Sequence, residues 1–220
     1  MPPKLMIFGR PQTKLSRSAA SLFCYTTSME EIEVKFLNID IAAIEAKLKA
    51  IGAKKVFNRL YRRKVYDYPD LRLNQAGAWV RVRDEGDKVT LGFKQRKEAG
   101  KDAGKNDAGM DEVELTVGDF DKTAQFLEKI GLVQKFYEEN RRIRWLKDDI
   151  EFDIDHWPML KPYLEIEASN WEDIDRGIAL LDLDPKDKKI FSTFQVYQLE
   201  GINELEYDII TFEKTIKKKT

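Results

Sequence analysis

The segment Glu31-Ile32-Glu33-Val34-Lys35 alternates charged and apolar residues. Alternation with a period of two is typical of a β-strand that has one polar and one apolar face. A related segment, Glu112-Val113-Glu114-Leu115, recurs further along the chain, and Glu165-Ile166-Glu167 forms a third, partial copy. The sequence therefore predicts an internal repeat in which each copy begins with a strand of this kind.

A helical pattern follows each copy. After the first copy, Asp40 is a favourable N-cap and Gly52 a favourable stop, and the apolar residues between them lie on one helical face. Asp119 and Gly131 hold the same places after the second copy. These patterns predict helices over 41–51 and 120–130, a third helix from Asn170, and a fourth near 194–200.

Between the helices, the chain is predicted to form antiparallel strands joined by short turns. The segment 98–109, rich in Gly, Lys, Asp and Ala, is predicted to be a loop rather than a domain boundary. The strands are expected near 30–37, 57–67, 77–84, 88–95, 111–116, 139–146, 149–155 and 162–168. This pattern indicates an α+β fold, and we expect a closed eight-stranded antiparallel β-barrel, a tunnel, with covering helices.

The predicted strands carry their charges on one face, because residues two apart in a strand share a face. On a single strand such a face is usually the solvent face. Helices, however, pack on an apolar sheet face, so a barrel covered by helices would have the charged face inside. A charged interior is costly without a ligand. The residues predicted to share it are Glu31, Glu33, Lys35, Arg81, Arg83, Lys94, Glu112, Glu114, Arg142, Arg144, Glu151, Asp153, Asp155, Glu165 and Glu167.

A polyphosphate that arrives with a divalent cation fits such a mixed face. Lys and Arg bind phosphate oxygens, and Arg can do so in a bidentate way. Two unit charges 4 Å apart repel by about 4 kcal/mol at an effective dielectric constant of about 20, so a carboxylate cluster favours a bound cation. Oxygen ligands of this kind suit Mg²⁺ or Mn²⁺. The sequence therefore predicts a metal-dependent site for a triphosphate.

The composition excludes several other classes of protein. The single cysteine, Cys24, cannot form an intramolecular disulfide and indicates a reducing compartment, and the single histidine, His156, excludes a multi-histidine zinc site. The 38 basic and 39 acidic side chains nearly cancel, which argues against a nucleic-acid or membrane-binding surface. No apolar run approaches the roughly 20 residues that span a bilayer. We therefore expect no nucleic-acid partner and no membrane partner.

Residues 1–28 differ from the rest, because they carry four basic residues and no acidic residue. This composition suits an organellar transit peptide, but an expression scar or an upstream start codon, with Met29 as the functional start, is the favoured interpretation. A cytoplasmic location is accordingly favoured over an organellar one. We expect a disordered extension over 1–28, one barrel domain over 29–214, and a basic tail over 215–220.

Taken together, these residues resemble the CYTH superfamily, the triphosphate tunnel metalloenzymes. Glu31-x-Glu33-x-Lys35 resembles its opening signature, and the resemblance covers roughly residues 29–210. The further matching segments are Val80-Arg81-Val82-Arg83, Thr90-Leu91-Gly92-Phe93-Lys94, Arg142 with Asp155, and Tyr163-Leu164-Glu165-Ile166-Glu167. The superfamily includes class IV adenylate cyclases, thiamine triphosphatases, inorganic triphosphatases and fungal RNA triphosphatases.

The resemblance implies a role for each matching residue. Metal binding would fall to Glu31, Glu33, Asp153, Asp155, Glu165 and Glu167. Phosphate binding would fall to Lys35, Arg81, Arg83, Lys94, Arg142 and Arg144. The catalytic set would be Glu31, Glu33, Lys35 and Arg142. One position departs from the family: Asn140 stands where lysine is common, which makes Arg144 the nearest substitute and counts against the cyclase interpretation.

Three functions remain open. The favoured one is hydrolysis of a triphosphate, in which water attacks the terminal phosphorus in line. The alternative within the same superfamily is a class IV adenylate cyclase that converts ATP to cyclic AMP and pyrophosphate. A non-catalytic polyphosphate- or nucleotide-binding module is the third. The expected ligands are tripolyphosphate, ATP or thiamine triphosphate, and the protein is expected to be a monomer or a homodimer.

Overall fold

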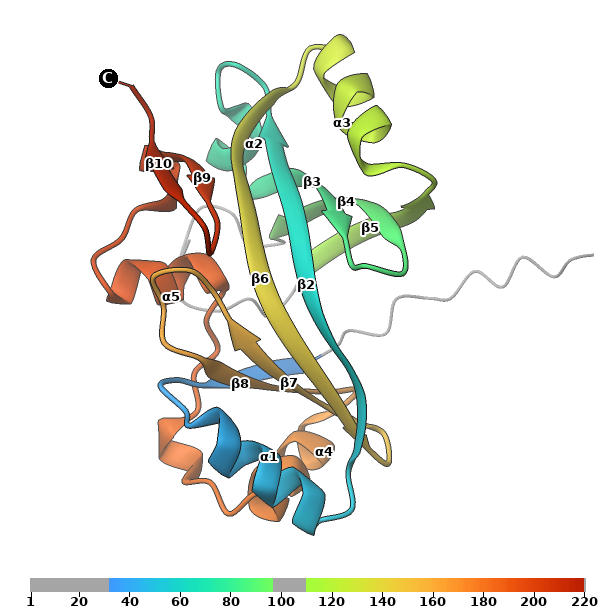
Figure 1. Ribbon diagram of the computed structural model, residues 1–220, viewed down its shortest axis with the longest axis vertical. Coiled ribbons are helices and arrows are strands. Elements are labelled where there is room, and N and C mark those ends of the chain that lie inside the picture. The colour runs from blue at the N-terminus through green and yellow to red at the C-terminus, as the bar shows by residue number, and fades with distance from the viewer. Residues whose placement is uncertain (1–31, 97–109, 220) are drawn as a thin grey trace, which may run out of the picture.

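The fold is built on one curled antiparallel sheet (Figure 1). A computed structural model describes residues 32–96 and 110–219. The path of hydrogen-bonded strands runs through β1 (Ile32–Phe36), β8 (Tyr163–Ala168), β7 (Ile150–His156), β6 (Val133–Lys147), β2 (Lys54–Asp67), β3 (Ala78–Asp84), β4 (Val89–Arg96) and β5 (Met110–Val117). Every pair along this path is antiparallel, so the predicted α+β class and the eight antiparallel strands are confirmed.

The sheet differs from the prediction at its edges. Among the described strands, β1 and β5 end the path and do not pair with each other, so the structure shows a half-barrel and closure stays a prediction. Two short strands were not predicted. Strand β9 (Tyr207–Ile210) pairs in parallel with β6, and β10 (Thr215–Lys217) pairs with β9. Residues 215–217, which the sequence analysis assigned to a basic tail, thus form a strand, and their side chains are exposed.

Strands β2 and β6 are longer than expected and link two halves of the sheet. Figure 1 shows them running side by side along the length of the molecule. Strands β3, β4 and β5 extend the sheet from one end of this pair, and β7, β8 and β1 extend it from the other. The charged face is therefore made of two groups of strands, which adjoin opposite ends of the β2–β6 pair.

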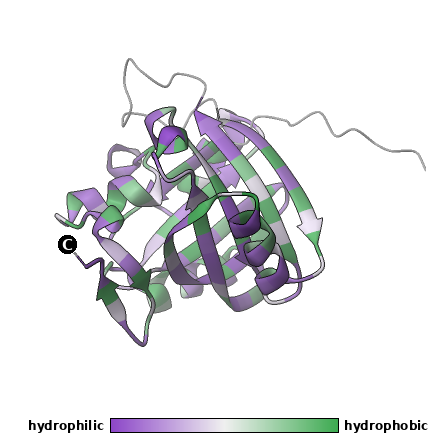
Figure 2. Cartoon of the chain, turned by 90° about the horizontal axis from the view of Figure 1, so that it is seen from above, coloured by the Kyte–Doolittle hydropathy of each residue, from purple (hydrophilic) through white to green (hydrophobic). Residues whose placement is uncertain are grey.

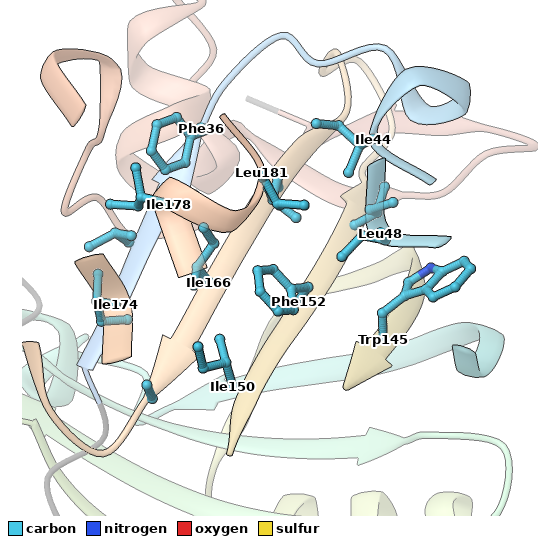
Figure 3. Close-up of a cluster of buried hydrophobic side chains, with 14 of the residues drawn as sticks. Phe36, Ile44, Leu48, Trp145, Ile150, Phe152, Ile166, Ile174, Ile178 and Leu181 are labelled. Atoms are coloured by element: carbon cyan, nitrogen blue, oxygen red, sulfur yellow. The ribbon is translucent and has the colours of Figure 1, made fainter. Parts of the chain in front are cut away.

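Two helices cover the outer face of β1, β7 and β8. These are α1 (Ile41–Ala50) and α4 (Trp171–Leu180), whose N-caps Asp40 and Asn170 accept hydrogen bonds from the first turn as predicted. Figure 3 shows their apolar side chains against the sheet, with Phe152 and Ile166 in the centre. A Cβ added to Gly177 of α4 would lie 3.0 Å from Ile166, so this glycine lets the helix approach the sheet closely.

Helix α3 (Phe120–Lys129) covers the outer face of β2, β3 and β4 in the same way. Its buried residues pack against Tyr66 and Val82, and Asp119 caps it as predicted. The short helix α2 (Arg72–Gln75) lies between β2 and β3. Figure 2 shows hydrophilic and hydrophobic residues alternating along the strands. The helices thus occupy the apolar face, which leaves the charged face on the concave side.

The C-terminal part of the described chain forms a third, smaller core. This part of the chain contains η1 (Pro185–Asp187), the predicted helix α5 (Thr193–Leu199) and η2 (Glu204–Glu206), and α5 contributes Val196 and Tyr197 to the core. Trp157, just after β7, packs there against Tyr197 of α5. No helix in the described ranges is long and apolar enough to cross a membrane. The expected extension over 1–28 and the expected loop over 98–109 lie outside the described residues.

Candidate functional site

The candidate site is the concave face of the sheet, which we divide into two halves. The acidic half comprises the inward residues of β1, β7 and β8 and the end of β6: Glu33, Lys35, Arg142, Arg144, Glu151, Asp153, Asp155, Glu165 and Glu167. The basic half comprises those of β3, β4 and β5: Arg81, Arg83, Lys94, Glu112 and Glu114. All of these residues were predicted to share one face, and the register of the strands brings each group together.

Every cation of the acidic half is paired with carboxylates. Arg142 donates to both oxygens of Asp155, contacts Asp153 at 2.7 Å and donates to Glu165 at 3.0 Å. These contacts and the surrounding negative charge raise the pKa of Arg142 against the opposing effect of burial. Because its donors are already engaged, Arg142 acts in this arrangement as the centre that holds the carboxylates in place.

Arg144 and Lys35 complete this network. Arg144 donates to both oxygens of Asp153, at 2.9 and 2.6 Å, and contacts Glu151 at 2.6 Å. Lys35 is 2% exposed and pairs with Glu33 and with Glu165, the latter at 3.3 Å. Burial opposes ionisation of Glu165, but Lys35 and Arg142 together lower its pKa to about 2. Glu165 is therefore an ionised carboxylate that lies almost entirely out of water.

This half contains two groups of three carboxylates, and within each group the oxygens are close enough to bind a single cation. Oxygens of Glu33, Glu165 and Glu167 lie within 4.8 Å of one another, as do oxygens of Glu151, Asp153 and Glu167. Glu167 belongs to both groups. The half contains six described carboxylates for three cationic side chains, so negative charge is in excess. Hard oxygen donors at this spacing fit a divalent cation such as Mg²⁺ or Mn²⁺.

The groups differ in part from the residues that the family resemblance implies. Asp155 belongs to neither group, because Arg142 and the amide of Asn140 occupy its oxygens. Glu151 belongs to one of them, although the sequence analysis gave it no role. Its place on the inward face of β7 was the signal that could have identified it. Glu31 lies outside the described residues, so its predicted role stays a prediction.

The basic half has the opposite electrostatic character. Arg81 is 8% exposed and contacts Glu114 at 3.3 Å, and Lys94 contacts Glu112 at 2.8 Å. Despite these carboxylates, burial and the neighbouring Arg83 and Arg63 lower the pKa of Arg81 to about 9. Burial and Arg81 likewise lower the pKa of Lys94. The cations here repel one another, which favours an anion bound between them.

The arginines of this half also have unused hydrogen-bonding capacity. The Nε atoms of Arg81 and Arg83 are buried and have no hydrogen-bond partner among the described residues, and the same holds for Arg63 on the adjoining strand β2. A buried donor without a partner costs about 1–3 kcal/mol, so each is a position where an acceptor would be stabilising. Phosphate oxygens are strong acceptors for guanidinium groups.

Two residues that the sequence analysis did not assign to the site join the two halves. Asn140 on β6 is fully buried, and its amide nitrogen donates to Asp155 at 2.8 Å. Its amide oxygen accepts a hydrogen bond from Arg63 on β2. The internal repeat held a signal for Arg63, because Arg62-Arg63 corresponds to Arg141-Arg142, and Arg142 had been assigned to the site.

A model of the CYTH domain family matches residues 29–187, most of the chain. The chain belongs to the CYTH domain family. The family predicted from the sequence is therefore confirmed, and the concave charged face described above lies on strands that this match spans.

Individual relatives agree with this assignment. The CYTH chain is 25% identical over 177 residues to a protein of Methanocaldococcus jannaschii named "Putative adenylate cyclase", covering 80% of this chain and 91% of that protein. A conserved hypothetical protein from Pyrococcus furiosus shares the fold with a TM-score of 0.61 and 18% identity, over 76% of this chain and 99% of its own. A Hippeastrum protein described as a "putative adenylyl cyclase" with "a dominant triphophatase activity" has a TM-score of 0.56 and 15% identity, over 80% and 98% of the two chains.

Proposed function

We propose that this CYTH protein hydrolyses a triphosphate bound on its concave face, with the help of a divalent cation. One observation carries the proposal: an excess of carboxylates in the acidic half lies on the same concave face as a basic half whose arginines have no hydrogen-bond partner at Nε among the described residues. A solvent-facing polar surface needs neither property. A simple anion-binding surface would not need the carboxylate groups.

The acidic half would hold the cation. Glu33, Glu165 and Glu167 offer one set of ligands, and Glu151, Asp153 and Glu167 offer another. When bound, a divalent cation polarises phosphate oxygens and acidifies a coordinated water. Lys35 and Arg144 pair with these same carboxylates, so they compensate part of the negative charge in this half. Asp155 would position Arg142 rather than bind metal.

The basic half would hold the phosphates. Arg81 and Arg83 present their Nε atoms, and Lys94 adds a third cation. Glu112 and Glu114 lie beside Arg81 and Lys94, so they hold these side chains in place until a ligand binds. The roles assigned to Lys35, Arg142 and Arg144 in phosphate binding require these residues to exchange a carboxylate for a phosphate oxygen.

The alternative within the family is an adenylate cyclase. The named relative from Methanocaldococcus jannaschii favours it, whereas the Hippeastrum protein's described triphosphatase activity favours hydrolysis. Both reactions need the same cation and the same grip on three phosphates. They differ in the nucleophile, which is water in one and the ribose 3′-hydroxyl in the other.

One assay separates these functions. The purified protein is incubated with tripolyphosphate, ATP or thiamine triphosphate, each with Mg²⁺ or Mn²⁺, and the products are measured as phosphate, pyrophosphate and cyclic AMP. Release of phosphate without cyclic AMP is the expected result. Cyclic AMP with equimolar pyrophosphate would establish the cyclase instead. Binding of tripolyphosphate without turnover of any substrate would leave only the non-catalytic module.

A further inference from the structure

Arg63 lies on the concave face between the two halves of the site. On β2 it is paired with Arg83 of β3 on one side and with Glu138 of β6 on the other. Arg62, its neighbour in sequence, points to the opposite face of the strand and pairs with Asp84. Strand geometry therefore directs Arg63 toward the concave face and Arg62 away from it.

The groups that contact the guanidinium of Arg63 are neutral. Its Nη2 donates to the amide oxygen of Asn140, and its guanidinium lies 4.3 Å from the ring centroid of Trp157. Within the described residues, no carboxylate lies within ion-pairing distance of it, whereas Arg81, Arg83, Arg142 and Arg144 each have at least one such partner. An amide and an indole ring fix the orientation of a guanidinium without neutralising its charge.

The supports of Arg63 are themselves fixed. Asn140 is buried and donates to Asp155, so its amide oxygen is directed at Arg63. Trp157 is 3% exposed and packs edge-on against Tyr197 of α5. A cationic side chain held this firmly loses little conformational freedom when it binds a ligand.

The local charge around Arg63 favours an added anion. Burial lowers the pKa of Arg63 from its ordinary value; Glu138 opposes this, and the positive charges of Arg83 and Arg142 add to it. The Nε atom of Arg63 is buried and has no hydrogen-bond partner in residues 32–96 and 110–219. Within the described part of the protein, one donor of Arg63 thus lacks a partner, and Glu138 offsets the positive charge only in part.

We propose that Arg63 is a further phosphate-binding residue of this site, held ready by Asn140 and Trp157. The inference rests on the proposed function, since it assumes that a triphosphate binds on the concave face. It assigns the positive charge at the junction of the two halves to β2, a strand from which the sequence analysis drew no site residue. Asn140 and Trp157 become positioning residues, because they act through Arg63.

The test compares Arg63→Gln with Arg62→Gln, which removes the neighbouring charge from the opposite face of the same strand. Binding of tripolyphosphate is measured by calorimetry without metal, and the melting temperature is measured without ligand. Arg63→Gln should weaken binding roughly 10- to 100-fold, the range expected for one charge-assisted hydrogen bond. Arg62→Gln should bind as the wild type does. The melting temperature of Arg63→Gln without ligand should stay within a few degrees of the wild-type value, since no ion pair is broken.

Several outcomes would overturn the inference. Unchanged binding by Arg63→Gln, or equal weakening in both variants, would show that Arg63 does not contact the ligand. A large fall in its melting temperature together with weaker binding would make Arg63 structural. If Arg63→Gln does not fold, Arg63→Lys replaces it, with several-fold weaker binding in support and wild-type binding against. A wild-type protein that binds no tripolyphosphate would overturn the proposed function as well, whereas wild-type binding with an inert Arg63 overturns this inference alone.

Discussion

The acidic and basic halves of the concave face are built from the same kind of strand but differ in how their charged side chains are paired. In the acidic half, Arg142 and Arg144 are saturated by carboxylates, and the excess charge is negative. In the basic half, burial and the neighbouring arginines lower the pKa of Arg81, and the Nε atoms of Arg81 and Arg83 have no hydrogen-bond partner among the described residues. The difference indicates that one half is arranged for a cation and the other for an anion. A single ligand that consists of both, a metal-bound polyphosphate, would satisfy the two halves together.

The largest effect should follow from removing Glu167, because it belongs to both carboxylate groups. We expect Glu167→Gln to lower turnover of the best substrate by about 100-fold or more. Loss of a residue that only supports a metal ligand typically lowers activity or metal affinity by about 10- to 100-fold, and loss of a ligand itself should cost at least as much. Glu151→Gln, which affects one group, should lower turnover less. Asp149→Asn, an exposed carboxylate beside β7, serves as the control. Steady-state turnover across Mg²⁺ and Mn²⁺ concentrations measures the effect, and full activity of Glu167→Gln in excess chelator would contradict the metal assignment.

The next effect concerns the basic half. Arg81→Gln should weaken tripolyphosphate binding by roughly 10- to 100-fold, because one or two charge-assisted hydrogen bonds are lost. Arg81 is a cleaner probe than Arg83, since Arg83 also pairs with the buried carboxylate Glu85. Ligand at about one hundred times its dissociation constant stabilises a protein by about 2.7 kcal/mol, so thermal melts with and without tripolyphosphate measure the loss.

The two halves should separate cleanly in these melts. Glu167→Gln should lose stabilisation by Mg²⁺ while keeping stabilisation by tripolyphosphate alone, and Arg81→Gln should show the reverse. If both variants lost both responses to the same extent, the division of the face into a cation-binding and an anion-binding half would be wrong.

The smallest effect concerns the dependence of stability on pH near the C-terminal segment. Glu204 of η2 and Glu138 of β6 are both buried, and burial followed by the charge of Glu138 raises the pKa of Glu204 well above its ordinary value. A raised pKa in the folded state gives stability that is present below the unfolded pKa and is lost as pH rises through the folded pKa. Glu165 has the opposite sign: its lowered pKa gives stability above about pH 4.5 that is lost as pH falls toward 2.

We therefore expect Glu204→Gln to melt above the wild type at pH 8 and close to it at pH 5. The difference at pH 8 should be roughly 2–4 °C, which corresponds to about 1 kcal/mol for a protein of this size. The exposed Glu200→Gln, on the same segment, should show no such dependence. If the melting temperatures of Glu204→Gln and the wild type differ by the same amount at pH 5 and pH 8, ionisation of Glu204 does not destabilise the folded protein and the prediction is wrong.

The sequence predicted most of the strands and all of the longer helices, because those elements depend on local pattern. Alternation placed Lys35, Arg81 and Asp153 on one face, and caps such as Asp119 fixed where helices begin. The strand ends were predicted less well. Strand β6 begins at Val133, not near residue 139, because its extra residues are stabilised by pairing with β2 and not by any pattern of their own.

Contacts between strands decided what the pattern left open. Alternation put Glu151, Asp153 and Asp155 on one face of β7 but could not tell that Asp155 would be taken up by Arg142 and Asn140, or that Glu151 would lie beside Glu167. That outcome depends on register, which is set when β7 pairs with β6 and β8.

The sequence by itself determined the family, the strand faces and the kinds of charge they carry, because these follow from residue type and a period of two. Only the tertiary structure decided which charges meet. Arg63 and Asn140 are far apart in the chain and carry no shared motif, yet their strands pair and bring a guanidinium onto an amide instead of a carboxylate. A side chain's electrostatic role depends on its neighbours in space, because a hydrogen bond forms only at contact distance and the Coulomb energy of two charges falls as their separation grows.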